Sequence, residues 1–371
     1  MLLLRVLPYH SLSLCADQRQ MFCEVEEKNS DAASSSSERT PCSILTGFLG
    51  AGKTTLINHI LKGRLHGLKV AVIENEFGEV GIDDALVLEA EEEVFEMNNG
   101  CVCCTVRGDL LRILGKLAKR ETKFDHILIE TTGLADPAPV AQTFFVDEDI
   151  KRAYELDAII TVVDAAHITQ HLEEVKPEGV ENEAVEQVAF ADKILLNKID
   201  LVCDEEKRSV MEKIRAINNF ADVLETQQSE VDLGKILGVK AFDLSRVLQV
   251  EEDFLDTEGE HQHDDSVTSV GIELAGSLDL EKLNLWLSKL LQERGVDIFR
   301  SKGVLNVAGS DARYVFQGVH MLMSISSSSD GVGREWKEDE QRSNRLVFIG
   351  RNLNREELVS SFMSCLSSSP R

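Results

Sequence analysis

Three cysteines within four residues form the densest group of chemically active side chains in the sequence. Cys101, Cys103 and Cys104 lie in residues 98–110, NNGCVCCTVRGDL. Thiolates at positions i, i+2 and i+3 can converge on one metal ion when the backbone turns, and a helix N-terminus after them would lower their pKa toward the metal-binding form. Zn²⁺ takes four ligands, so three sulfurs leave one open position. An open position suits metal transfer better than a permanent structural site.

The fourth position and the identity of the metal stay open at this stage. Glu76, a water molecule or a ligand from a client protein could complete a zinc site, and Cu(I) also binds thiolates well. Two readings involve no metal: cysteines that pack as small apolar groups, and a redox pair formed by Cys103 and Cys104. The other five cysteines are scattered along the chain, a pattern that favours a reducing compartment over a disulfide framework.

A phosphate-binding motif stands upstream of the thiols. Residues 47–54, GFLGAGKT, fit the pattern G-x-x-x-x-G-K-[ST] between a short apolar strand at 43–46 and a helical pattern that begins after the motif. Glycines let backbone N–H groups approach phosphates, and the helix N-terminus adds a positive dipole. We expect Lys53 to reach the β- and γ-phosphates and Thr54 to bind Mg²⁺. The predicted nucleotide-binding residues of this loop are Gly47, Gly50, Ala51, Gly52, Lys53, Thr54 and Thr55.

The base specificity is predicted by a second motif at the end of another strand. Residues 193–196 read as a buried strand, followed by Asn197, Lys198 and Asp200 in the pattern N-K-x-D. The Asp200 carboxylate can accept hydrogen bonds from both N1–H and the 2-amino group of guanine, an arrangement that adenine does not offer. We expect Asn197 to hold the loop and the base edge. GTP is therefore the predicted nucleotide, with ATP as the alternative.

Acidic residues at two further strand ends are candidates for metal and water. The apolar strand at 127–129 ends in Glu130, where P-loop enzymes hold Mg²⁺, often through water, and Gly133 would let the backbone approach the γ-phosphate. Glu130 could instead cap the following helix. Residues 74–84 resemble a switch loop, in which Glu76 and Asp83 are candidates for Mg²⁺, water or a second metal; the alternative is that both are solvated surface acids.

The elements that position these motifs indicate two domains in a chain of 371 residues. We expect a leader at 1–40, either disordered or targeting, then an α/β nucleotide-binding domain at 41–248 with a mainly parallel sheet. The thiols would occupy a strand-to-helix loop within it. The formal net charge of −26 argues against nucleic acid as the main partner. The apolar start of the chain is too short to span a bilayer.

A smaller α+β domain is predicted for residues 267–371 after an acidic flexible linker at 249–266. It has alternating strand patterns, a helix at 278–293 with leucines on one face, and a final capped helix at 354–366. The linker carries His261 and His263, which could hold a metal weakly, although a solvated linker is the simpler interpretation. His320 reads as a packed or surface residue.

These motifs, in this order, resemble the CobW family of P-loop GTPases, whose eukaryotic branch includes zinc-regulated GTPase metalloprotein activators. The resemblance covers residues 42–366 and rests on TGFLGAGKTTLINHIL, AVIENEFGEVGIDDALV, NNGCVCCTVRGDL, ILIETTGLADPAPVAQTFF and the segment that ends in FADKILLNKIDL. It implies a CobW-type GTPase domain followed by a CobW C-terminal domain. By motif match, Cys101, Cys103 and Cys104 become the zinc site, with GTP or GDP, Mg²⁺ and Zn²⁺ as ligands.

The resemblance also implies a function: a GTP-hydrolysing metallochaperone that delivers zinc to a client metalloprotein, slow without that client and cytoplasmic unless the leader directs it to an organelle. Some relatives carry an N-terminal Cys-Pro motif that docks a methionine aminopeptidase; residues 1–40 contain no convincing copy. The alternatives are a nucleotide-gated zinc sensor or reservoir that transfers nothing, and a P-loop kinase with structural cysteines.

Overall fold

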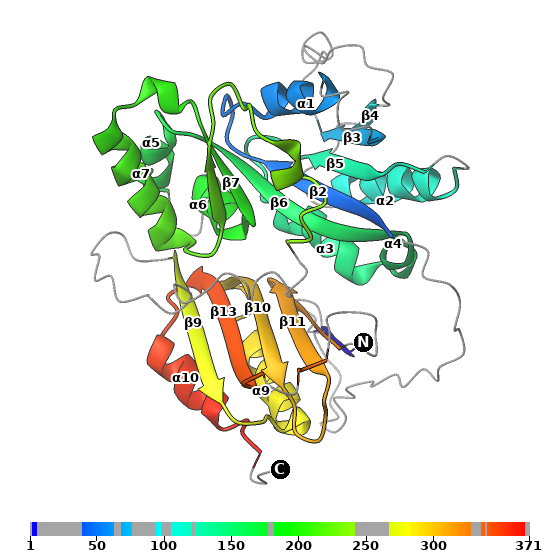
Figure 1. Cartoon of the computed structure of the whole chain (residues 1–371), viewed down its shortest axis with the longest axis vertical. Helices are drawn as coiled ribbons and strands as arrows, with labels where there is room; N and C mark the ends of the chain where they lie inside the picture. The colour runs from blue at the N-terminus through cyan, green and yellow to red at the C-terminus, as the bar shows by residue number, and fades with distance from the viewer. Residues whose placement is uncertain are drawn as a thin grey trace, which may run out of the picture.

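The computed structural model describes the chain in ten segments: residues 2–5, 39–62, 68–75, 94–97, 105–120, 123–176, 182–241, 267–327, 335–337 and 340–367. They form two layered units, each built on one sheet (Figure 1). Within these segments no helix is both long enough and apolar enough to cross a bilayer.

The first unit is built on a parallel sheet of seven strands in the order β4-β3-β5-β2-β6-β7-β8. The bounds of its strands, in chain order, are β2 Thr40–Thr46, β3 Val70–Asn75, β4 Val94–Met97, β5 His126–Glu130, β6 Tyr154–Asp164, β7 Lys193–Asn197 and β8 Asp222–Glu225. The central strands are apolar on both faces, as helix-covered parallel strands must be. The prediction of a mainly parallel sheet is confirmed.

Helices cover both faces of this sheet. They are α1 Lys53–Lys62, α2 Thr105–Ala118, α3 Ala138–Val146, α4 Glu148–Ala153, α5 Ile168–Leu172, α6 Glu183–Phe190 and α7 Asp204–Ile217. Helix α1 buries Leu56 and Ile57 against one face, whereas α2 and α3 bury Leu110 and Phe144 against the other. Because every strand is parallel, the carboxyl ends of all seven meet at one edge, where the loops carrying the predicted motifs begin.

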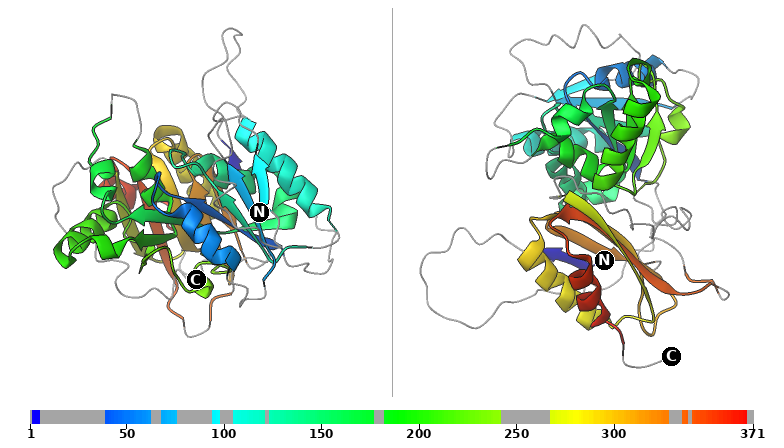
Figure 2. Two further views of the ribbon diagram at one scale, coloured as in Figure 1. Left: turned by 90° about the horizontal axis from the view of Figure 1, so that it is seen from above. Right: turned by 90° about the vertical axis from the view of Figure 1, so that its left-hand side faces the viewer.

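The second unit is an antiparallel sheet with two helices on one face (Figure 2). Its elements are β9 Val267–Ala275, α9 Leu280–Arg294, β10 Ile298–Asn306, β11 Arg313–Val319, β12 Leu322–Ser326, β13 Ser343–Arg351 and α10 Arg355–Met363. Asp279 caps α9 by accepting hydrogen bonds from two backbone N–H groups of its first turn. The predicted smaller α+β domain is therefore present.

One strand comes from the predicted leader. Residues Leu2–Arg5 form β1, which pairs antiparallel with β12 at the edge of the second sheet. An edge strand presents unpaired backbone N–H and C=O groups, and these accept any extended segment that can reach them. For these four residues the expectation of a disordered leader is not what the structure shows, and residues 6–38 lie outside its described part.

Candidate nucleotide-binding site

The loop after β2 has the backbone shape that a phosphate cradle requires. Gly47, Gly50 and Gly52 have φ values of 140°, 76° and 117°, in the region that disfavours side chains. A Cβ atom on Gly47 would lie 2.2 Å from the carbonyl oxygen of Val162, and one on Gly52 would lie 2.5 Å from Nδ2 of Asn197. The glycines of the motif therefore permit both its left-handed turns and its close packing against β6 and β7.

Lys53, the first residue of α1, closes back over this loop. Its ammonium donates to the carbonyl oxygens of Gly47 at 2.7 Å and Phe48 at 3.4 Å, and the residue is only 8% exposed. The side chain thus already lies along the mouth of the loop. Phosphate oxygens entering there would meet a buried positive charge as well as the N-terminus of α1.

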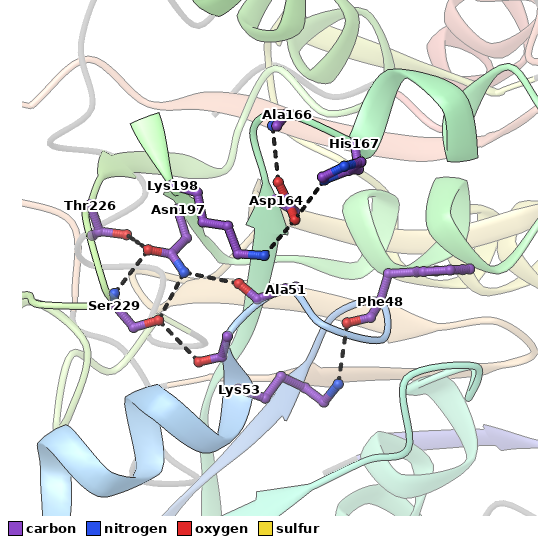
Figure 3. A network of polar contacts seen from close by, with 11 residues as sticks. Phe48, Ala51, Lys53, Asp164, Ala166, His167, Asn197, Lys198, Thr226 and Ser229 are labelled. Carbon is purple, nitrogen blue, oxygen red and sulfur yellow. Dashed lines mark hydrogen bonds and ion pairs between the residues drawn. The ribbon is translucent and has the colours of Figure 1, made fainter. Parts of the chain in front are cut away.

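Asn197 joins the phosphate loop to two other segments (Figure 3). Its Nδ2 donates to the carbonyl of Ala51 at 2.9 Å and to Oγ of Ser229 at 3.0 Å, while its Oδ1 accepts from the Thr226 hydroxyl and the Ser229 backbone N–H. These four bonds use the full capacity of the amide. Asn197 therefore holds the loops together in this structure, and Asp200, three residues further on, is exposed.

Thr226 and Ser229 were not predicted from the sequence. They follow β8, the strand that pairs with β7, so the loop after β8 opens at the same sheet edge as the guanine motif. Gln228 and Ser229 have positive φ values of 49° and 57°, which gives this loop a tight, unusual turn. The signal available in the sequence was a polar run, Thr-Gln-Gln-Ser, directly after a short strand.

Lys198 is held by a carboxylate from the neighbouring strand. Its ammonium lies 2.7 Å from Oδ2 of Asp164, the last residue of β6, and the same carboxylate accepts from Nδ1 of His167 at 3.0 Å (Figure 3). Burial would raise the pKa of Asp164, but hydrogen bonds from Lys198, His167 and the Ala166 backbone outweigh it and lower that pKa. The carboxylate is therefore charged at neutral pH, and it holds the Lys198 ammonium at the end of β6.

Glu130 ends β5 beside the phosphate-loop strand, in register with Leu45 of β2. Thr54 stands in the first turn of α1, after the same strand, so a hydroxyl and a carboxylate are offered at one sheet edge. This hard oxygen pair fits Mg²⁺, which binds through few protein ligands plus phosphate oxygens.

Gly133 packs directly on the phosphate loop. A Cβ atom there would lie 2.7 Å from both the backbone nitrogen and Cγ of Leu49. Glycine is therefore required by space at the point predicted to approach the γ-phosphate.

A pocket of about 380 Å³ opens beside the phosphate loop. It is lined by Phe48 and Gly50 of the phosphate loop, by residues of α5 and α6, and by Asp164 and Lys198. Phe48 stacks on His171 with ring centroids 3.8 Å apart. The pocket is thus continuous with the guanine motif rather than a separate site.

The predicted zinc ligands lie outside the described residues. Cys101, Cys103, Cys104 and Glu76 belong to this group, as do Asp83, His261 and His263. The elements on either side of the thiols are described: β4 ends at Met97, beside β3, and α2 begins at Thr105, directly after Cys104. Within the described segments, no three His, Cys, Asp or Glu side chains gather as a metal site would require.

Comparison with known proteins matches both units. Residues 41–225 match the CobW/HypB/UreG nucleotide-binding domain, and residues 267–366 match the cobalamin synthesis protein cobW C-terminal domain. The chain is 37% identical to the zinc chaperone YjiA of Escherichia coli over 86% of this chain and 96% of that protein. It is 34% identical to the zinc-regulated GTPase metalloprotein activator 1 of Schizosaccharomyces pombe, over 85% and 83% respectively.

A solved structure agrees with the sequence comparison. The crystal structure of Zn(II)-bound YjiA GTPase from Escherichia coli superposes with a TM-score of 0.67 and 32% identity. The match covers 89% of this chain and 99% of that one. Both units are therefore found together in this relative.

Proposed function

This chain belongs to the CobW family of P-loop GTPases, and on that premise we propose that it is a GTP-hydrolysing metallochaperone for zinc. The observation that carries the nucleotide half is the Asn197 network, which ties the phosphate loop, the guanine motif and the loop after β8 into one site. Relatives named zinc chaperone and zinc-regulated GTPase metalloprotein activator support the metal half.

The residues divide the work by chemistry. The backbone of residues 47–55 and the Lys53 ammonium receive the phosphates, and Asp200 selects guanine. Mg²⁺ held by Thr54 and Glu130 would neutralise charge that develops on the phosphates. Because Gly133 has no side chain, its backbone N–H can approach the γ-phosphate. Hydrolysis is slow until a client completes the site, as is common in GTPases that wait for a partner.

Zinc binding is assigned to the three thiolates of Cys101, Cys103 and Cys104, with Glu76 as the candidate fourth ligand. Support comes from the flanking elements, since the thiols are followed at once by the N-terminus of α2, a position that favours thiolates. The strand before them, β4, lies in the same parallel sheet as β2, the strand that leads into the phosphate loop. A nucleotide-dependent change at that edge can therefore alter metal coordination, and hydrolysis would release zinc to a client metalloprotein in the cytoplasm.

The nucleotide assignment is tested by hydrolysis measured with GTP and with ATP, with and without Mg²⁺. We expect Mg²⁺-dependent GTP hydrolysis and little ATP hydrolysis. Equal use of both nucleotides would contradict the guanine assignment and favour a general P-loop phosphotransferase.

The metal assignment is tested by zinc stoichiometry in the reduced chain. Changing Cys101, Cys103 and Cys104 to serine should abolish tight binding of one zinc, whereas the matched control Cys203→Ser, an exposed cysteine, should retain it. Undiminished binding in the triple variant would move the metal site elsewhere. Cysteine-dependent binding without release to any apo-metalloprotein would favour a sensor or reservoir over a chaperone.

A further inference from the structure

Helix α6 contacts the loop after Glu130 through one buried side chain. The Gln187 amide donates to the carbonyl oxygens of Gly133 at 3.1 Å and Ala135 at 3.2 Å. Gln187 is only 2% exposed, so both N–H groups have these carbonyls in place of water. The loop that must approach the γ-phosphate is thus held on one side by the phosphate loop, through Gly133 and Leu49, and on the other by Gln187.

The neighbouring residue of the same helix contacts the C-terminal domain. The Glu186 carboxylate accepts from the guanidinium of Arg351, the last residue of β13, at 3.2 Å. That guanidinium also lies over the ring of Phe299 in β10, with its carbon 4.9 Å from the ring centroid. Glu186 is 2% exposed and the Arg351 side chain 25%, so this is a partly buried ion pair between the two domains.

The end of α6 is anchored to the C-terminal domain as well. Phe190, fully buried, lies 5.8 Å from Phe299 and 5.1 Å from His320 between ring centroids. Asp192, in the turn before β7, accepts from Arg300 at 2.6 Å and also from Lys302. Removing one partner of a buried charge pair leaves the other charge buried without compensation, so such pairs resist separation. Helix α6 and the turn after it are therefore held against the C-terminal domain by packing and by ion pairs.

We propose that Gln187 is a positioning residue for GTP hydrolysis, and that α6 transmits the state of the Gly133 loop to the C-terminal domain through the Glu186–Arg351 pair. This inference rests on the GTPase function proposed above. GTP presents a γ-phosphate to the Gly133 backbone and GDP does not. A shift of the Gly133 and Ala135 carbonyls changes their bonds to Gln187, and Glu186 follows because it is adjacent on the same helix.

The first test replaces Gln187 by methionine in the full chain, keeping the side-chain length and removing both donors. Gln292→Met, at an exposed position on α9 of the C-terminal domain, is the matched control. Two lost hydrogen bonds predict a fall of about tenfold in single-turnover GTP hydrolysis and in affinity for a non-hydrolysable GTP analogue. GDP affinity should stay within about twofold, because GDP lacks the γ-phosphate. A purely structural role would reduce both affinities together, and that result would overturn the proposal.

The second test begins with a variant in the other domain, so its first result does not depend on the fold of Gln187→Met. Arg351→Gln should change the ratio of GTP-analogue to GDP affinity by about threefold or more, although Arg351 lies in the other domain. The double variant with Gln187→Met should then deviate from the product of the single effects. A ratio equal to that of wild type in Arg351→Gln, or simple multiplication in the double variant, would overturn the coupling.

The two proposals fail in different ways. A wild-type chain that neither binds nor hydrolyses GTP would remove the proposed function and this inference together. A wild-type chain that hydrolyses GTP, beside a Gln187→Met variant with unchanged hydrolysis and an unchanged affinity ratio, would remove only the inference.

Discussion

Both halves of the parallel sheet carry polar and charged residues, but those at the carboxyl ends border an open pocket, whereas a group in the amino half is enclosed by the protein. At the carboxyl ends, Phe48, Asp164 and Lys198 line an open pocket. In the amino half, Ser43 donates to Asp157 at 3.2 Å and lies 3.0 Å from Nε2 of His126, a Ser–His–Asp group with none of its members more than 2% exposed.

The enclosed group has the composition of a hydrolase triad without its arrangement. Serine stands between the other two, so Asp157 contacts the hydroxyl and not the histidine, and the carboxylate also accepts from backbone N–H groups of Val239 and Lys240. A triad requires the carboxylate on histidine and an accessible hydroxyl. Residue types indicate chemistry only where a substrate can reach them, and the enclosed group is a structural link between β2, β5 and β6.

The largest expected effect lies at the open end. Lys53→Ala should reduce GTP hydrolysis on the order of a thousandfold, because a buried positive charge at the phosphates is lost. Urea unfolding should show only a small change in stability, since Lys53 contributes two hydrogen bonds to loop carbonyls. If Lys53→Ala unfolds readily but hydrolyses GTP at the normal rate, Lys53 has a structural role and not a role in hydrolysis.

Base selection gives the next effect. Asp200→Asn replaces an acceptor of N1–H and the 2-amino group by an amide that can donate to a 2-oxo group. We expect guanine affinity to fall on the order of a hundredfold and xanthine affinity to rise. Competition between GDP and XDP measures the switch. Unchanged selectivity for guanine over xanthine would show that residues other than Asp200 bind the base.

At the enclosed end, the expected effect is on stability and its pH dependence. Burial lowers the pKa of His126 from 6.5 to about 4. As pH falls below 6.5, the unfolded chain takes up a proton that the folded chain refuses, so stability decreases until about pH 4. Between pH 6.5 and 5 this loss amounts to about 2 kcal/mol.

His126→Gln, which keeps a donor toward Ser43, should remove that pH-dependent loss while hydrolysis at pH 7 changes little. Urea unfolding at pH 6.5 and pH 5 provides the comparison with wild type. An equally steep pH dependence in the variant would show that another group is responsible.

The smallest effect is expected at the centre of the enclosed group. Ser43→Ala deletes the hydroxyl between His126 and Asp157 and should cost about 1 kcal/mol of unfolding free energy, with hydrolysis nearly unchanged. Thermal unfolding and GTP turnover measured together check this. A large loss of turnover without loss of stability would show that Ser43 contributes to hydrolysis and not only to stability.

Sequence reasoning predicted what depends on short segments. The phosphate loop, the strand that ends in Asn197 and the two-domain order follow from contiguous patterns of glycine, charge and apolar residues. That Asp200 lies at the same edge of the sheet as the phosphate loop could be predicted, because the carboxyl ends of parallel strands share one edge.

Contacts between distant segments could not be predicted. Nothing local in residues 183–192 shows that Gln187 turns toward Gly133 and Glu186 toward Arg351, 165 residues away. His126 begins β5 and Asp157 lies near the start of β6, and the sequence does not show which neighbouring strand supplies a partner for either side chain. The pairing of Leu2–Arg5 with β12 depends likewise on an edge exposed only after folding.

The central claim is that the nucleotide state controls zinc binding, and competition for zinc against a chromophoric chelator tests it most directly. The reduced chain is measured with GDP and with a non-hydrolysable GTP analogue, beside the variant in which Cys101, Cys103 and Cys104 are serine. We predict that the two nucleotide states differ in zinc affinity by about tenfold, a typical coupling of about 1.4 kcal/mol, and that the variant loses tight binding in both. Equal zinc affinity with GDP and with the GTP analogue would contradict the account.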